Sequence, residues 1–155
     1  MPPARVFLVV VDDSPEMRAA LRFACRRARS SGGRVALLRV IEPAEPQHFA
    51  TIGELMRAEA RQDAEDLLDR LAGEVNAVSG HLPVLYVREG KPREELLGVI
   101  AEEPSISVLV LAADPGPGGP GPLVTALTGK YVGRLRVPVT IVPGSLTDGQ
   151  IDAIT

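Results

Sequence analysis

Two parts of this 155-residue sequence hold residues whose types could act on a ligand. Asp12 and Asp13 directly follow an apolar run at residues 5–11, and carboxylates at the end of a buried strand either contact a ligand or cap and solvate the strand. Residues 113–122 are rich in glycine and proline, and Lys130 lies a short distance after them. A loop of this kind binds phosphate by aiming backbone N–H groups at anionic oxygens. Phosphate binding therefore depends on how many donors the loop offers.

The composition of this loop argues against tight phosphate binding. Proline has no backbone N–H group, and prolines occupy positions 115, 117, 120 and 122. Within residues 115–122 only the glycines can donate, and the stretch contains no lysine or arginine. Neutralising a phosphate would rest on Lys130, which follows Gly129 and is expected to begin a short helix. The alternative interpretation is a loop that simply caps the sheet.

Five apolar runs predict strands that are buried on both faces, as in a parallel sheet. They cover residues 5–11, 35–41, 82–88, 107–112 and 137–142. Four helices are expected between them, because apolar residues there repeat at helical spacing and caps or breaks mark the ends. These helices begin with Ser14 as N-cap, with a capping box at residues 51–54, at Pro92 and at Leu123, the last running to Leu135 with a break at Gly129.

The alternation of strands and helices implies right-handed β-α-β units and helices on both faces of a parallel sheet. We therefore predict an α/β fold, doubly wound, with the strand order 3-2-1-4-5 and four helices. Ligands of such sheets bind outside the carboxyl ends of the strands, at the point where the winding reverses. This rule places Asp12 and Asp13, Val40, Glu89 with Gly90, and the loop that starts at Ala112 around the candidate site.

Length and composition limit the classes of protein to consider. The chain is expected to be one domain, residues 1–155, with a core at 5–143 and a polar tail at 144–155. A net charge of −3 with interleaved signs gives no electrostatic footprint for nucleic acid. No apolar run is long enough for a membrane span, and a cytoplasmic location is expected. Cys25 is the single cysteine, so neither a disulfide nor a metal cluster is expected.

Four segments of the sequence, in order, resemble the universal stress protein family. They are residues 9–14 with the arginine- and alanine-rich helix that follows, residues 38–43, residues 89–97 and residues 137–142. The resemblance covers about residues 5–143. It implies a fold of the adenine-nucleotide alpha-hydrolase-like kind and a role in the response to stress.

Nucleotide-binding members of that family share a G-x2-G-x9-G-(S/T) pattern after the fourth strand. Gly116, Gly119 and Gly129 match its spacing, but Lys130 replaces the serine or threonine, and Ala112 stands where the first glycine would directly follow the strand. An alternative alignment puts Ala112 and Pro115 in the glycine positions. The resemblance implies that ATP or another adenine nucleotide, with Mg²⁺, would contact a set of residues spread over three strand ends and the loop. The set is Val11, Asp12, Val40, Ala112, Gly116, Gly119, Gly129, Lys130 and Tyr131.

The start of the chain is also similar to a response-regulator receiver domain, in which an acidic pair holds Mg²⁺ beside a phosphorylated aspartate. That chemistry requires an aspartate after strand three, a serine or threonine after strand four and a lysine after strand five. The sequence has Arg88-Glu89-Gly90, Ala112-Ala113-Asp114 and Pro143-Gly144 at those places. A receiver is therefore disfavoured.

Two functions remain open. The first is a non-catalytic stress-response module that acts as a dimer and through an unidentified protein partner, without tight ATP binding. The second is an adenine-nucleotide-binding protein with at most weak hydrolysis. No serine, histidine and aspartate arrangement stands out, so no catalytic residue is assigned.

The dimer is expected to form through the last strand, which is an edge of the predicted sheet. An edge strand exposes unpaired N–H and C=O groups, and this strand carries no charge. The family resemblance implies the same interface. The residues expected in the interface are Val137, Val139, Thr140, Ile141 and Val142.

Overall fold

Five parallel strands form the sheet at the centre of the computed structural model, which describes residues 3–43 and 50–155. Their order is β3-β2-β1-β4-β5, so the predicted order 3-2-1-4-5 is confirmed. The strands are β1 (Val6–Val10), β2 (Arg34–Ile41), β3 (Val84–Glu89), β4 (Ile106–Ala113) and β5 (Val139–Pro143). Because β1 lies in the middle, its two neighbours are reached by connections that wind in opposite directions along the sheet.

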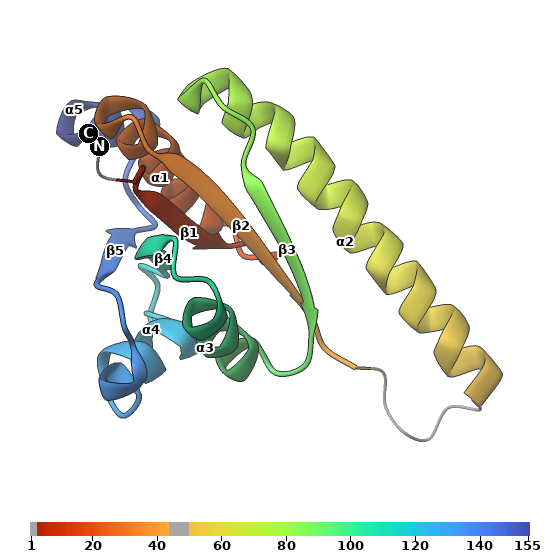
Figure 1. Ribbon diagram of the computed structural model, residues 1–155. Helices are drawn as coiled ribbons and strands as arrows, with labels where there is room; N and C mark the ends of the chain where they lie inside the picture. The colour runs from red at the N-terminus through yellow and green to blue at the C-terminus, as the bar shows by residue number, and fades with distance from the viewer. Residues whose placement is uncertain (1–2, 44–49) are drawn as a thin grey trace.

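Helices cover both faces of this sheet (Figure 1). Side chains alternate along a strand, so Phe7 and Val9 of β1 face one layer while Val6 and Leu8 face the other. The first layer contains α1 (Met17–Ser31), α2 (Ala50–Ser79) and α5 (Asp148–Ile154). The second contains α3 (Pro92–Glu102), α4 (Pro122–Thr128) and the 3-10 turn η1 (Val132–Arg134).

The described residues form five α-helices, where the sequence predicted four. The fifth lies in residues 144–155, which were expected to be a polar tail without a regular pattern. Thr147 and Gln150 make a capping box there, in which the Thr147 side chain accepts from the Gln150 N–H and the Gln150 side chain accepts from the Thr147 N–H. Ile151 of α5 is fully buried against the first layer. A cap and one apolar anchor therefore turn this segment into a docked helix.

Other helix boundaries also differ from expectation. The predicted fourth helix is divided, because α4 ends at Thr128, and only a short 3-10 turn from Val132 follows the expected break at Gly129. Thr51 was expected in a capping box, but α2 already includes Ala50 and Thr51, and residues 44–49 lie outside the described part. Helix α1 ends before Gly32, which takes the left-handed conformation, with φ of 70°, that ends helices.

Helix α2 extends well past the sheet (Figure 1). Its second half is anchored by buried residues such as Leu68 and Val75, whereas Ile52, Leu55 and Met56 in its first half are exposed. An ion pair of 2.7 Å between Arg57 and Glu89 joins the first half to the end of β3. The two halves of this helix are therefore supported very differently.

Candidate functional site

A cavity of about 200 Å³ lies at the carboxyl ends of β1, β2 and β4, where the switch-point rule predicts a ligand site. Its walls are mostly apolar, and its polar groups are Asp12, Ser14, Glu16 and Arg39. Pockets that enclose a drug-sized ligand hold roughly 300–1,000 Å³, so this cavity suits one ring system or a similarly small group. The apolar walls come from Val10, Val11, Met17, Ala20, Val40, Leu111, Ala112, Leu123 and Val124, with Pro92 and Pro122 at the starts of α3 and α4 and with Pro120 and Gly121 from the β4–α4 loop.

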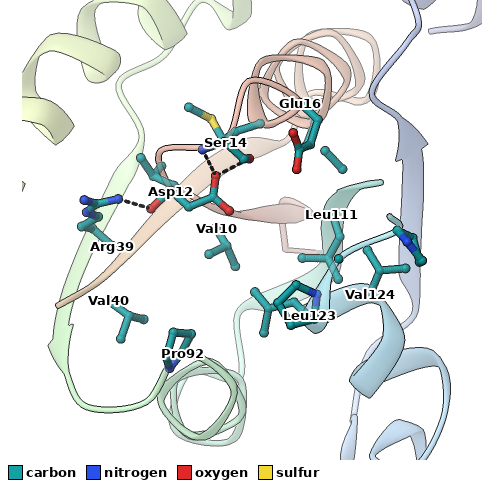
Figure 2. Close-up of a pocket in the computed structure, with 17 residues that line it drawn as sticks. Val10, Asp12, Ser14, Glu16, Arg39, Val40, Pro92, Leu111, Leu123 and Val124 are labelled. Carbon is teal, nitrogen blue, oxygen red and sulfur yellow. Dashed lines mark hydrogen bonds between the residues drawn. The ribbon is translucent and has the colours of Figure 1, made fainter. Parts of the chain in front are cut away.

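The turn between β1 and α1 forms the polar side of this cavity (Figure 2). The backbone N–H and the hydroxyl of Ser14 both donate to Oδ1 of Asp12, over 2.9 and 2.5 Å. Ser14 was expected to be the N-cap of α1, but that place belongs to Glu16, and no side chain caps the helix. Ser14 instead holds the Asp12 carboxylate at the rim of the cavity. The other carboxylate oxygen of Asp12, Oδ2, makes no hydrogen bond to a described residue.

Arg39 lines the cavity from the end of β2 and was not among the residues selected from the sequence. Its guanidinium donates to the Val11 carbonyl over 3.2 Å and pairs with the Asp13 carboxylate at 3.3 Å. Arg39 therefore joins β2 to the end of β1, and both of its terminal nitrogens, Nη1 and Nη2, have partners. The signal in the sequence was the single charged residue within the apolar run at residues 35–41.

The loop between β4 and α4 uses most of its own donors. The Asp114 N–H donates to the Pro120 carbonyl, and the Gly116 N–H donates to the Asp114 side chain. The Gly119 N–H donates to the Gly116 carbonyl. Within the described residues, only the N–H groups of Gly118 and Gly121 in this loop have no such partner. A concave anion site needs successive N–H groups that converge. Two separated donors do not supply one.

The structure divides the predicted nucleotide-binding residues into two groups. Val11, Asp12, Val40 and Ala112 line the cavity together. The other five are not among the lining residues and lie on the β4–α4 loop or after α4: Gly116, Gly119, Gly129, Lys130 and Tyr131. Close packing accounts for two of the glycines, because a Cβ on Gly119 would collide with the Asp114 carbonyl and one on Gly129 would lie 2.9 Å from the Thr125 carbonyl.

Tyr131 belongs to a charged cluster that joins α3 to η1. The Arg93 guanidinium lies 4.0 Å from the centroid of its ring, a cation–π distance, and Lys130 Nζ lies at 5.7 Å. Glu94 pairs with Arg134 and Arg93 at 3.3 Å each, and their hydrogen bonds lower the pKa of the Glu94 carboxyl. Lys130 and Tyr131 therefore contribute to the packing between α3 and η1 in the second layer of helices.

A second hollow, of about 590 Å³, lies between α1 and α2. It shares Asp12, Ser14 and Met17 with the first cavity, and Cys25 is one of its lining residues. Burial raises the pKa of the Cys25 thiol to about 12, so the thiol stays protonated at neutral pH and is a poor nucleophile. Cys25 is therefore a small buried apolar residue of the core.

Residues 3–43 and 50–155 offer neither a metal site nor a membrane span. No group of three or more histidine, cysteine or acidic side chains in these ranges is placed to hold a metal ion. No helix in them combines the length and apolar character that crossing a membrane requires.

Comparison with known proteins identifies the family. A sequence model of the universal stress protein family matches residues 3–143, which is most of the chain. The chain belongs to the universal stress protein family. A search of curated protein sequences found no match.

Solved structures of universal stress proteins share this fold. UspA from Lactobacillus plantarum aligns with a TM-score of 0.72 at 19% identity, over 92% of this chain and 99% of that one. The universal stress protein from Archaeoglobus fulgidus in complex with dAMP aligns with a TM-score of 0.57 at 16% identity, over 91% and 98%. A family member from Arabidopsis thaliana with AMP bound aligns with a TM-score of 0.60 at 18% identity, over 91% and 92%. At such identities the likeness is one of fold.

Proposed function

We propose that this universal stress protein is a non-catalytic module of the stress response, which acts as a homodimer and through protein partners and does not hold ATP tightly. The observation that carries the proposal is the hydrogen bonding of the β4–α4 loop, whose N–H groups at Asp114, Gly116 and Gly119 are already used within the loop. A triphosphate placed there would find few donors and no lysine or arginine in the loop itself. Tight binding of phosphate at such sites comes from converging N–H groups.

The non-catalytic part of the proposal is supported by the polar groups of the cavity. Its side chains with polar atoms are Asp12, Ser14, Glu16 and Arg39, and none of the described lining residues is a histidine or lysine. The Ser14 hydroxyl donates to the adjacent Asp12 carboxylate, which is already occupied by the Ser14 N–H at the same oxygen. This short turn resembles a structural motif more than a nucleophile with a base oriented by a third group.

Titration with ATP and Mg²⁺ by isothermal calorimetry tests the proposal. We expect no saturation below millimolar ATP and no release of phosphate over that of a buffer blank. Titration of the Arabidopsis relative, whose structure has AMP bound, with AMP is the positive control for detecting nucleotide binding. Saturation of this protein at micromolar ATP would refute the proposal.

The dimer is proposed to form through β5, an edge of the sheet that, among the described residues, pairs with β4 alone. Two copies of such an edge can pair antiparallel about a two-fold axis and so satisfy each other's backbone groups. Ile141 is 38% exposed there, and Val139 and Thr140 are half-buried. Val137 and Val142, also expected in the interface, are buried in this chain's own core, so their side chains are not free to touch a partner.

Light scattering tests the dimer directly. The wild type is expected at twice the 16.4 kDa of one chain. Ile141→Lys should yield the monomer, because it buries a charge in the proposed interface, whereas Ile154→Lys, at a position 63% exposed on α5, should stay dimeric. A monomeric wild type, or a dimer that survives Ile141→Lys, contradicts this interface.

Adenine-nucleotide binding is the second candidate function. It is favoured by the place of the cavity, which four of the predicted residues line, and by relatives whose structures contain dAMP, cAMP or AMP. Mass spectrometry of the purified, denatured protein separates the two candidates. A stoichiometric nucleotide released from the protein would favour the second.

A further inference from the structure

The charged side chains around the cavity do not favour an anion. Two carboxylates, Asp12 and Glu16, and one guanidinium, Arg39, line it, which leaves a net formal charge of one negative. The Arg39 guanidinium is engaged by the Val11 carbonyl and by the Asp13 carboxylate, and the latter offsets its charge. A phosphate group entering the cavity would therefore meet unbalanced negative charge.

Glu16 stands out among these groups because nothing described in the structure neutralises it. Its side chain is half-buried and forms neither an ion pair nor a hydrogen bond with a described residue. Its Cβ packs so closely on Gly144 that a Cβ on that glycine would collide with it, and the Gly144 N–H is tied to the Ala113 carbonyl over 2.8 Å. Figure 2 shows Glu16 and Asp12 on the α1 side of the cavity, with Pro92 and Leu123 across from them.

We infer that this cavity admits an uncharged, hydrogen-bond-donating ligand of about nucleoside size, rejects the phosphate esters of that ligand, and owes this selectivity to Glu16. The inference rests on the proposed function, in which the β4–α4 loop does not hold a triphosphate. To the proposed function it adds the chemical class of the ligand and the residue that determines the selectivity.

The two sides of the cavity match such a ligand. Pro92, Pro120 and Pro122 with the aliphatic side chains give flat apolar walls, against which a neutral ring system buries its surface. The free oxygen of Asp12 and both oxygens of Glu16 are acceptors without a described partner, so they are suited to ribose hydroxyls or to an amino group. The cavity volume of about 200 Å³ fits one ring system, with the sugar at the acidic rim.

Glu16 also has a second, purely structural consequence. It precedes the first residue of α1, where a negative charge is favourable for the helix. A substitution at Glu16 is therefore expected to lower thermal stability slightly whether or not the residue faces a ligand. Ligand selectivity, read as a ratio of two dissociation constants on the same variant, does not change for that reason.

Calorimetric titration of the wild type with adenosine, AMP and ATP provides the test. We expect adenosine to saturate the site and to bind about tenfold more tightly than AMP at low ionic strength. The repulsion between the AMP phosphate and one unpaired carboxylate is moderate, because water partly screens it. The ratio should shrink as salt is added, because salt screens the repulsion but not the apolar contact. ATP should bind more weakly than AMP.

Glu16→Gln keeps the shape of the side chain and removes its charge. We expect it to strengthen AMP binding by about five- to tenfold and to change adenosine binding by less than about twofold. Glu102→Gln is the matched control, since it removes the same charge from the far end of α3, which is about 15 Å along the helix from Pro92. It should leave both ligands unchanged.

The outcomes separate this inference from the proposed function. If neither adenosine nor ATP saturates, the inference is overturned and the proposed function stands. If ATP saturates at micromolar concentration, the proposed function falls as well. A wild type that binds AMP more tightly than adenosine, or a Glu16→Gln variant whose ligand ratio matches that of Glu102→Gln, also overturns it, and the wild-type ranking needs no variant to fold.

Discussion

The docking of α5 makes a sharp prediction for Ile151→Ala. The Ile151 side chain is fully buried between α5 and α1, in a segment that reads as a polar tail. The change removes three carbon groups, each worth about 0.8 kcal/mol of burial, and leaves a cavity that adds to the loss. We expect the free energy of unfolding to fall by about 2–4 kcal/mol.

Urea denaturation followed by circular dichroism at fixed protein concentration measures this loss. Ile154→Ala is the matched control: the same substitution in the same helix, at a side chain that is 63% exposed. It should cost less than about 0.5 kcal/mol. If α5 can detach without unfolding the domain, the loss at Ile151 is limited by the free energy of detachment. Equal effects of the two substitutions would show that α5 is not docked, and the reasoning would be wrong.

Three other outcomes are expected. Asp152 pairs with Arg22 at 2.7 Å, and the hydrogen bond from Arg22 lowers the pKa of the Asp152 carboxyl. Because the pKa is lowered in the folded protein, the pair stabilises the fold above the ordinary aspartate pKa near pH 4. This stabilisation is lost as the pH falls below that range. Thermal unfolding of Asp152→Asn should therefore differ from that of the wild type at pH 7 and converge with it near pH 2, and a constant difference would contradict this. Arg136 donates to the carbonyls of Ile100 and Glu103 at the end of α3 and of Ile106, the first residue of β4, so Arg136→Met should lose about 1–3 kcal/mol in urea denaturation, more than Arg134→Met, whose ion pair with Glu94 is exposed to solvent. The Cys25 thiol, with a pKa of about 12, should react with a disulfide reagent only after denaturant is added; a fast reaction of the native protein would show that the helix layer opens readily.

The parallel sheet could be predicted from the sequence because each strand is a largely apolar run bounded by turn residues. Such runs need cover on both faces, which fixes a parallel sheet and helices on either side. The helix α5 could not be predicted by the same rule. The apolar residues of this segment are few and follow no clear repeat, and the partners of Ile151 lie on α1, more than a hundred residues earlier. The capping box at Thr147 and Gln150 was the one local signal that could have indicated it.

The candidate site divides in the same way. Asp12, Val40 and Ala112 could be placed from the sequence, since the carboxyl ends of central strands meet at the switch point. Arg39 and Glu16 could not, because their positions over the cavity depend on how β2 and α1 pack on β1. The glycine spacing after β4 indicated a phosphate loop, but the hydrogen bonds show that Gly116 and Gly119 shape the loop itself. Spacing alone does not distinguish a glycine that makes room for a ligand from one that makes room for its own backbone.

Because the two halves of α2 are supported so differently, the number of residues that are helical in α2 should depend on temperature and salt. The half that carries Leu68 and Val75 melts only with the domain, whereas residues 52–63 rely on helix propensity, side-chain pairs along the helix and the one ion pair to Glu89. A free helical stretch of about a dozen residues is marginal in water. Heat or salt would therefore shorten α2 from its beginning, turn by turn, while the sheet and the cavity remain intact. The amount of helix in this protein is then a graded property, although its fold is not.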